Sequence, residues 1–434
     1  MNKIVKRKLK KEIKLLFILV LIIISIVFYK SFFKNKNENI IKQEDKIDYV
    51  TNDSEIDNDI IANIFANGMN VEDYKKIYNF TPELLKSYTK YSKIDYNFEK
   101  SLTYYEIEQI IKKMNNSNIV KTYILGQTHD NRNIYNIEIG SGKKILLLDA
   151  NMHAAESANT PLLLKFLIDI LNDYESGNET IKKLLSDVKI SAIPCVNPDG
   201  YEVYNFGIEA INNKNLWIYQ NKDTVSINHF KYNANGVDLN RNFPTQNGGL
   251  YYKENKLLKS VSLKKTTKRY TYFGGEILGS EPEVRIVMYH MLKNYKNSYA
   301  YINMHSQGRL MYCGKPNLSK EYNDITISLC KRMAKITNYR VYGLDREEVG
   351  EGNDGTASDF MAELANGFIF SSKTGRLSSK YYKKMSGKLV QSVPAIVLET
   401  MNDNYKNPKY YKNEYYSRGL KDMFYDLVQY VYEQ

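Results

Sequence analysis

The chain has 434 residues, of which 43% are hydrophobic and 25% are charged, proportions that are ordinary for a globular protein. This length accommodates one large α/β domain or two average ones. About half of the formal net charge of +12 comes from a basic cluster at the N-terminus, so the rest of the chain is only mildly basic. Such a weak charge argues against a nucleic-acid partner. The three cysteines are too few for a disulfide framework and lack the CxxC spacing of a metal site.

The first 33 residues have the pattern of a membrane anchor. Lysines and one arginine crowd into residues 1–14, and an apolar run follows at residues 15–29 and continues to residue 33. The positive-inside rule places residues 1–14 in the cytoplasm as a basic tail, and everything after a transmembrane anchor of residues 15–33 outside the cell. We therefore predict a single-pass cell-membrane protein. A cleaved signal peptide, which would make the protein secreted, is the alternative, although the flank lacks a small-x-small cleavage site.

Residues 34–100 are polar and predict a stalk or N-terminal extension, with weak helical patterns at residues 59–76 and 82–91. The texture changes just after residue 100. Thr103 and Glu106 make a T-x-x-E capping box ahead of isoleucines at helical spacing. Residues 101–434 are therefore expected to form one compact domain.

Short apolar runs alternate with helical patterns through this domain. Strands are expected at residues 144–149, 189–195, 301–304 and 395–398, and helices are expected to open at Thr160 with Pro161 and around Pro282. The alternation is typical of an α/β domain in which a mixed, largely parallel β-sheet is flanked by helices. Ligands bind at the carboxyl ends of the strands in such sheets, so functional side chains are expected there.

Metal-ligating side chains follow two of these strands. His153 and Glu156 come after the first with H-x-x-E spacing, and His305 follows the strand at residues 301–304. Zinc sites that perform catalysis use three protein ligands from His, Glu or Asp and leave a fourth position for water. The other histidines of the chain stand in a turn, a loop and a helical pattern. The sequence therefore predicts one zinc ion held by His153, Glu156 and His305.

Glu399 directly follows the buried run Ala-Ile-Val-Leu at residues 395–398. Water activated by zinc needs a carboxylate that takes its proton and passes it to the leaving amine. We expect Glu399 to act as this general base and then as the general acid. An ordinary exposed glutamate at a strand end is the alternative.

Four further segments stand in a recognisable order along the chain. They are Gly-Gln-Thr-His-Asp-Asn-Arg-Asn-Ile-Tyr at 126–135, Asn-Pro-Asp-Gly-Tyr at 197–201, Gly-Val-Asp-Leu-Asn-Arg-Asn-Phe-Pro at 236–244 and Ser-Glu-Pro-Glu at 280–283. Together with the three candidate ligands and Glu399, they resemble the zinc carboxypeptidases of the carboxypeptidase A type. The resemblance covers the chain from about residue 101 and implies a zinc carboxypeptidase-like fold and hydrolysis of peptides.

The resemblance also implies roles for residues around the third segment. Asn240 and Arg241 are expected to hold the terminal carboxylate of a substrate, since an Arg binds a carboxylate bidentately and an Asn amide adds a donor. A loop ion pair between Asp238 and Arg241 is the alternative. Animal members stabilise the oxyanion with an Arg, and Lys231 is the candidate for this role here. A lysine that is merely solvated is the alternative.

The substrate side chain is expected to meet Ser358. This serine precedes Asp359 and Phe360, which match the family's Asp-aromatic pair, so the resemblance puts a small neutral residue at the specificity position. Neither a large aliphatic nor a strongly acidic pocket is predicted. One departure from the family is that its H-x-R-E reads His-Ala-Ala-Glu at 153–156, so an additional Arg contact to the substrate backbone is missing.

These features predict a zinc metallocarboxypeptidase that acts as a monomer and hydrolyses a peptide bond next to a carboxylate-bearing residue. Bacterial proteins of this type resemble γ-D-glutamyl diamino-acid peptidases, so peptidoglycan stem peptides of the cell wall are the expected substrate. Two alternatives remain. One is an N-acyl amino acid deacylase of the aspartoacylase type, which also has an Asp-Leu-Asn-Arg stretch. The other is a non-catalytic cell-wall-binding module, which would hold no zinc.

Overall fold

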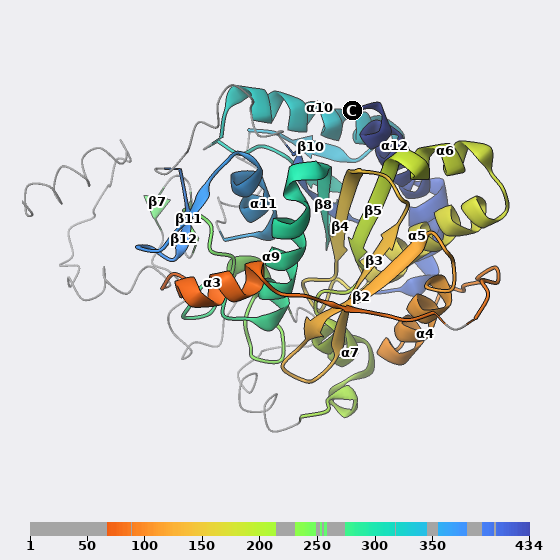
Figure 1. Cartoon of the computed structure of the whole chain (residues 1–434), viewed down its shortest axis with the longest axis horizontal. Coiled ribbons are helices and arrows are strands. Elements are labelled where there is room, and N and C mark those ends of the chain that lie inside the picture. Colours follow the sequence, from red (N-terminus) through yellow and green to blue (C-terminus); the bar gives the residue numbers. More distant parts are fainter. Residues whose placement is uncertain are drawn as a thin grey trace, which may run out of the picture. The chain divides into compact units, whose positions relative to one another are not determined.

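The computed structural model describes residues 67–87, 89–213, 231–248, 252–253, 256–257, 274–316, 318–344, 355–379, 393–402 and 405–434. Within these residues the largest sheet has nine strands in the order β1-β2-β3-β5-β4-β8-β13-β9-β10. Helices cover both of its faces (Figure 1). The predicted α/β domain with a flanked sheet is confirmed.

The strands have the following bounds: β1 (Glu83–Leu84), β2 (Val120–Gln127), β3 (Asn133–Ile139), β4 (Lys144–Ala150), β5 (Val188–Ile193), β6 (Tyr252–Lys253), β7 (Lys256–Leu257), β8 (Ser298–Ser306), β9 (Leu310–Tyr312), β10 (Arg340–Tyr342), β11 (Ile369–Ser371), β12 (Arg376–Ser378) and β13 (Ala395–Thr400). The α-helices are α3 (Val71–Tyr78), α4 (Tyr104–Met114), α5 (Asn159–Glu175), α6 (Glu179–Asp187), α7 (Pro198–Phe206), α9 (Pro282–Asn294), α10 (Lys320–Thr337), α11 (Ala357–Ala365) and α12 (Leu420–Glu433).

The centre of the sheet is parallel. Strands β5, β4, β8 and β13 are neighbours, and each adjacent pair runs in the same direction. Every residue of β4 after Lys144 is buried, as expected for a strand covered on both faces. Antiparallel pairing joins β1, β2 and β3 on one side and β9 on the other. The sheet is therefore mixed, with a parallel core, as the sequence predicts.

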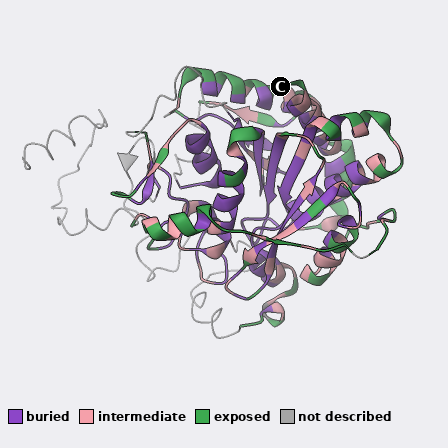
Figure 2. Cartoon of the chain, in the orientation of Figure 1, coloured by how far each residue is buried: buried purple, intermediate pink, exposed green. Residues whose placement is uncertain are grey.

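Two hydrophobic clusters hold the layers together. One contains buried side chains of α4, α5, α6 and α12 and the strand residues that face them, and the other contains those of α9 and α11. Figure 2 shows the central strands and the inward sides of these helices as buried, with exposed residues on the outer helical surfaces. Apolar surface removed from water on both sides of the sheet is the main stabilising contribution to such a fold.

The helix signals of the sequence are confirmed at three places. Thr103 Oγ1 accepts a hydrogen bond from the Glu106 backbone N–H at 3.2 Å, and the Thr103 N–H donates to Glu106 Oε2 at 2.9 Å, which completes the capping box of α4. Helix α9 begins at Pro282, and α5 begins at Asn159, one residue before the predicted opening.

The strands that carry candidate site residues are longer than the sequence indicates. Strand β8 extends through His305 to Ser306, and β13 extends through Glu399 to Thr400. In the parallel ladder Glu399 is the direct partner of His305. The two residues therefore lie in the last part of adjacent strands rather than in the loops after them, because the backbone ladder continues past the apolar runs.

The described part of the predicted stalk, residues 67–100, packs against the domain. Helix α3 overlaps the end of the first weak helical pattern and extends two residues beyond it. The second pattern is wrong, because β1 forms there and pairs antiparallel with β2. Met69, Ile94 and Phe98 are buried in the two hydrophobic clusters. Apolar spacing over so short a segment does not separate a strand from a helix, which explains the error.

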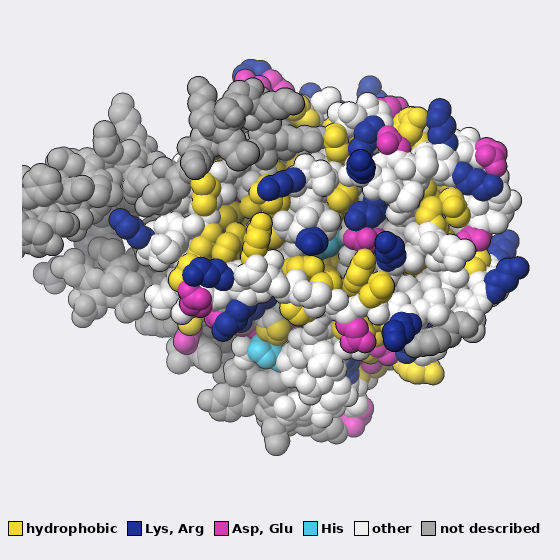
Figure 3. Space-filling view, in the orientation of Figure 1, with side chains coloured by type: hydrophobic (Ala, Val, Ile, Leu, Met, Phe, Trp, Pro, Cys, Tyr) yellow, Lys and Arg dark blue, Asp and Glu magenta, His cyan; other side chains and the backbone are white. Residues whose placement is uncertain are grey.

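The predicted membrane localisation is corrected. Among the described residues, none of the helices has the length and apolar character needed to span a bilayer. The segment predicted as the anchor, residues 15–33, lies outside the described residues. On the face shown in Figure 3, Lys and Arg side chains are spread among acidic, apolar and neutral ones.

Candidate metal centre and active site

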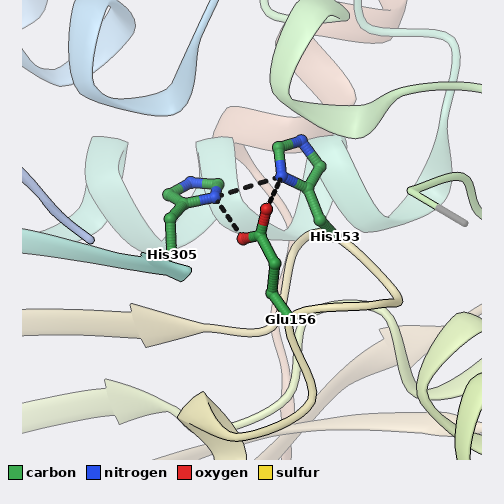
Figure 4. A group of neighbouring side chains, drawn as sticks. All are labelled: His153, Glu156 and His305. Carbon is green, nitrogen blue, oxygen red and sulfur yellow. Dashed lines mark hydrogen bonds and ion pairs between the residues drawn. The ribbon is translucent and has the colours of Figure 1, made fainter. Parts of the chain in front are cut away.

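Three side chains converge at the carboxyl end of the parallel strands (Figure 4). His153 and Glu156 project from the segment between β4 and α5, and His305 projects from the end of β8. All three are buried, and their ligand atoms lie within 4.8 Å of one another. The structure thus brings together the three residues that the sequence singles out as zinc ligands.

The distances within this trio fit a tetrahedral metal. His153 Nδ1 is 2.8 Å from Glu156 Oε1, His305 Nδ1 is 2.8 Å from Glu156 Oε2, and the two Nδ1 atoms are 3.2 Å apart. Ligand atoms of a tetrahedral zinc site, at about 2.0–2.1 Å from the ion, are separated by roughly 3.3 Å. Both imidazoles therefore present the same nitrogen to a common point.

The second nitrogen of each imidazole has its own partner. His153 Nε2 lies 3.0 Å from Asp238 Oδ1, and His305 Nε2 lies 2.7 Å from Asn303 Oδ1. Such partners fix the tautomer and the ring orientation of metal-binding histidines and raise their basicity as ligands. No motif of the sequence marks these roles. Asp238 contacts His153, and its charge also interacts with that of Arg241.

The charges of the trio are mutually compensating. Burial disfavours the charged imidazole of His153, but the carboxylates of Glu156 and Asp238 outweigh this and raise its pKa to about 9. Burial lowers the pKa of His305. Although burial also disfavours the charged form of Glu156, the two histidines hold its pKa well below the ordinary value. The trio therefore retains a proton that a bound cation would displace.

The Asn-Pro-Asp-Gly segment supports the loop that carries His153. Asn197 Oδ1 accepts a hydrogen bond from Gly200 N at 2.8 Å and caps α7, while Asn197 Nδ2 donates to the Met152 carbonyl at 3.3 Å. A Cβ on Gly200 would lie 2.6 Å from the Cβ of Ala154, so only glycine allows this approach. The motif therefore positions the metal loop.

Glu399 and Lys231 lie beside the trio. Burial and the Glu156 carboxylate raise the pKa of Glu399 to about 8, and the Lys231 charge opposes this rise. Lys231 Nζ is 3.8 Å from Glu156 Oε1, and its side chain is 38% exposed. Burial disfavours the charge of Lys231, but the surrounding carboxylates outweigh it and raise its pKa. A carboxyl group and an ammonium group thus border the metal centre.

Asn240 and Arg241 form a short 3₁₀ turn at the same end of the sheet. Asn240 Nδ2 is 3.3 Å from His305 Nε2, and its Oδ1 accepts a hydrogen bond from the Ala357 N–H at 2.9 Å. Arg241 Nη1 donates to the Asn240 carbonyl at 2.6 Å. Asn240 therefore connects the metal centre to the start of α11.

Ser358 lies in the first turn of α11 and is 1% exposed. Lys315 Nζ donates to Ser358 Oγ at 3.0 Å and forms an ion pair with Asp359. Lys315 itself is buried. No motif of the sequence marks Lys315, which lies in the loop after β9, far along the chain from Ser358. A buried Lys315–Asp359 ion pair thus lies beside the small neutral residue expected at the specificity position.

A family model matches the part of the chain that contains the candidate ligands. The model for zinc carboxypeptidases matches residues 107–380, more than half of the chain. The chain belongs to the zinc carboxypeptidase family. The matched region includes all three candidate ligands and stops before Glu399. The family is described as zinc carboxypeptidase, and the three candidate ligands have the geometry of a site for one zinc ion.

Curated relatives match parts of this zinc carboxypeptidase. The human carboxypeptidase N catalytic chain is 31% identical over 143 residues, which cover 31% of this chain and 28% of that protein. Gamma-D-glutamyl-L-diamino acid endopeptidase 1 of Lysinibacillus sphaericus is 29% identical over 210 residues, which cover 47% and 49%. Carboxypeptidase O of Bos taurus is 26% identical over 236 residues, which cover 51% and 56%. The chain thus spans between about a quarter and just over half the length of these relatives.

Solved structures show the same fold. Bovine thrombin-activatable fibrinolysis inhibitor, in complex with tick carboxypeptidase inhibitor, has a TM-score of 0.56 at 17% identity over 77% of this chain and 99% of that chain. Carboxypeptidase A from Helicoverpa armigera has a TM-score of 0.52 at 16% identity over 79% and 77%.

Of the three other histidines of the chain, two lie apart from this trio and one lies outside the described residues. His290 is buried in α9, where its Nε2 is 2.8 Å from Ser191 Oγ, and burial lowers its pKa to about 3. His129 lies near Glu281, in a separate group. His229 lies outside the described residues. Within the described part of the chain, His153 and His305 are therefore the two histidines of the candidate metal centre.

The raised pKa of Glu399 has a measurable consequence for the zinc-free protein. Its pKa is about 8 in the folded chain against an ordinary value of 4.5, so the folded state binds more protons between these values. The stability that protonated Glu399 contributes is present at pH 4.5 and is lost as pH rises toward 8. We expect zinc-free Glu399→Gln to match the parent at pH 5 and to melt about 2 °C or more above it at pH 8.

Differential scanning calorimetry of both chelated proteins at the two pH values measures this difference. Zinc should shrink it, because a nearby cation stabilises the ionised carboxylate. The raised pKa of Glu399 would be contradicted if the difference in melting temperature between Glu399→Gln and the parent were the same at pH 5 and pH 8.

Proposed function

We propose that this zinc carboxypeptidase hydrolyses a peptide bond next to a carboxylate-bearing residue in cell-wall peptides, with His153, Glu156 and His305 as its zinc ligands. The observation that carries the proposal is the convergence of these ligands with Glu399 and Arg241 on one end of the sheet. A zinc ion held there supplies a Lewis acid that activates water and polarises the scissile carbonyl.

Glu399 performs the proton transfers. It takes a proton from the attacking water as general base and gives it to the leaving amine as general acid. Its place opposite His305 in the ladder puts the carboxyl group beside the metal centre. Burial keeps the carboxyl group poorly solvated, which favours a proton affinity suited to transfer near neutral pH.

Lys231 stabilises the oxyanion that forms on the scissile carbonyl. Its Nζ lies 3.8 Å from Glu156 Oε1 and therefore at the border of the metal centre. The carboxylates around it raise its pKa, so the ammonium stays charged at neutral pH. A fixed positive charge at this place lowers the energy of a developing negative oxygen more than that of a neutral carbonyl.

Arg241 and Asn240 bind the carboxylate next to the scissile bond. The guanidinium of Arg241 matches the two oxygens of a carboxylate. Asn240, the residue before it, has its side-chain amide beside His305. Because the clamp and the metal centre share this end of the sheet, a substrate held by its carboxylate presents the adjacent peptide bond to the zinc ligands.

The surroundings of Ser358 favour a substrate side chain that carries a second carboxylate. Lys315 supplies a buried ammonium group to Ser358 and Asp359 at the start of α11, which Asn240 connects to the metal centre. Lys315 has three N–H donors, and Ser358 and Asp359 accept from two of them, so a substrate carboxylate that shares Lys315 with Asp359 would take the third as a charge-assisted hydrogen bond. The relative from Lysinibacillus sphaericus, named for a γ-D-glutamyl-L-diamino acid substrate, supports cell-wall peptides as the substrate class.

Mass spectrometry of cleavage products tests this function. The purified chain is incubated with peptidoglycan stem peptides and with a library of ordinary peptides with free C-termini, each with zinc and with a chelator. We expect zinc-dependent release of a carboxylate-bearing residue or fragment from the stem peptides. Cleavage of only the ordinary peptides would contradict the cell-wall assignment, and cleavage of neither would contradict the peptidase assignment.

Replacement of Lys315 tests the substrate side chain. A charge-assisted hydrogen bond is worth about 1.5–3 kcal/mol, so Lys315→Met should lower kcat/KM roughly 10- to 100-fold for substrates with an acidic side chain next to the cut. Substrates with a neutral side chain there should lose little. Steady-state kinetics on matched peptides measures both values, with Lys335→Met on α10 as the control. An equal loss on both substrates would show that Lys315 serves only packing.

A further inference from the structure

A second group of metal-ligating side chains lies outside the zinc centre. His129 stands in the turn between β2 and β3, Glu281 caps α9 and Glu283 lies in its first turn. One ligand atom from each lies within 4.8 Å of the others, and His129 Nε2 is 3.0 Å from Glu281 Oε2. The two carboxylates are buried, while the His129 side chain is 33% exposed. The group is therefore reachable from solvent through its histidine.

One carboxylate oxygen of this group accepts no hydrogen bond from the described residues. Glu283 is fully buried, and its Oε1 has no hydrogen-bond partner among the residues that the structure describes. Its Oε2 accepts from Asn233 Nδ2 at 3.1 Å, and the same amide donates to Glu281 Oε2 at 2.8 Å. A buried carboxylate oxygen without a donor is costly, because burial removes the water that would otherwise bind it. Glu283 thus offers a vacant ligand atom within the group.

The charges around the group do not balance. Arg132 is already paired with Asp130 and Asp199, so its positive charge does not compensate Glu281 or Glu283. Glu281 and Glu283 then face a single imidazole. In the absence of a cation, burial and the carboxylates of Glu281 and Asp199 raise the pKa of Glu283 to about 8. With both carboxylates ionised, the group would carry more negative charge than the side chains around it compensate, so without a cation Glu283 keeps a proton near neutral pH.

The N-terminus of α9 offsets part of this charge but not all of it. A helix N-terminus is equivalent to roughly half a positive charge. Two ionised carboxylates would exceed that compensation even when His129 is protonated, so ionising both requires a further positive charge. A divalent cation would supply the missing charge and a partner for Glu283 Oε1.

We propose that His129, Glu281 and Glu283 bind a second divalent cation, of the zinc or manganese class, separate from the zinc centre. One imidazole and two carboxylates are a ligand set that suits these metals. The site is not part of the catalytic trio, with which it shares no residue.

The cation would brace the segment that carries the substrate clamp. Asn233 and Asn235 both donate to the Glu281 carboxylate, and Asn242 Oδ1 accepts from the Glu281 N–H at 3.2 Å. These asparagines flank Lys231 and Arg241 in the segment of residues 231–243. Fixing Glu281 and Glu283 by a cation would therefore fix this segment and, with it, the positions of Lys231 and Arg241.

Metal content of the full chain with His305→Ala tests the proposal, because this change removes a ligand of the zinc centre. The protein is stripped with a chelator, equilibrated with Zn²⁺ or with Mn²⁺ and dialysed, and bound metal is measured by mass spectrometry alongside thermal unfolding. We expect one ion per chain and a higher melting temperature with metal. Adding Glu283→Gln should weaken binding on the order of tenfold or more and abolish the thermal shift.

Two comparisons keep the test decisive. Glu276→Gln, an exposed glutamate just before α9, serves as the matched control and should leave binding unchanged. If circular dichroism shows that the chain with Glu283→Gln is unfolded, His129→Gln replaces it, because His129 is partly exposed. His129→Gln should likewise weaken metal binding and abolish the thermal shift. The proposal would be overturned if the His305→Ala chain bound neither Zn²⁺ nor Mn²⁺. It would also be overturned if adding Glu283→Gln or His129→Gln left the metal binding of that chain unchanged.

Discussion

Replacing Glu399 with Gln is expected to lower kcat by about 10²- to 10⁴-fold, the range of a lost general acid–base group. Gln has the shape of Glu but cannot accept the proton of the attacking water or return it to the leaving amine. KM should change little, because the carboxylate clamp and the zinc ligands are untouched. Steady-state kinetics on a peptide with a free carboxylate, together with metal content, measures both effects.

The zinc content of the catalytic site should remain the same in Glu399→Gln, since Glu399 is not among its proposed ligands. Glu138→Gln on β3, which removes a glutamate paired with Lys189 away from the metal centre, is the matched control and should keep full activity. Full activity of Glu399→Gln would refute its catalytic role. A loss of activity in step with a loss of zinc would make it a metal-site residue instead.

Replacing Arg241 with Met should give the second large effect. Removing one partner of a desolvated charge pair costs about 2–5 kcal/mol, so kcat/KM should fall roughly 30- to 5 × 10³-fold on substrates with the free carboxylate. Most of the loss should appear in KM, because the clamp holds the substrate before and during the reaction. Kinetics on paired substrates with a carboxylate or an amide at that position measures it.

The amide substrate separates recognition from folding. The parent should discriminate strongly against it, whereas Arg241→Met should treat the two substrates nearly alike. Arg285→Met, which removes an arginine paired with Asp73 on α3, controls for the loss of one positive charge. Retained discrimination in Arg241→Met would show that another group binds the carboxylate.

The convergence of the three candidate zinc ligands could be predicted because local rules dictate their positions. The apolar run of β4 is buried on both faces and ends at Ala150, so His153 and Glu156 had to leave it at the edge where ligands bind. The second parallel strand delivers His305 to the same edge. The capping box of α4 and Pro282 at the start of α9 are also local signals, and both are confirmed.

The partners of the ligands could not be predicted, because they depend on how distant segments pack. Asp238 reaches His153 across 85 positions of sequence, and Lys315 reaches Ser358 across 43. No spacing rule connects such pairs. The length of β13 beyond Leu398 was equally hidden, since the ladder continues through a polar residue once its neighbours β8 and β9 are in place.

Zinc-edge anomalous diffraction from crystals of the zinc-loaded chain tests the central claim most directly. We predict an anomalous peak bounded by Nδ1 of His153, Nδ1 of His305 and the carboxylate of Glu156, at about 2.0–2.2 Å from each ligand atom. A zinc-loaded crystal with no peak between these three side chains would contradict the account.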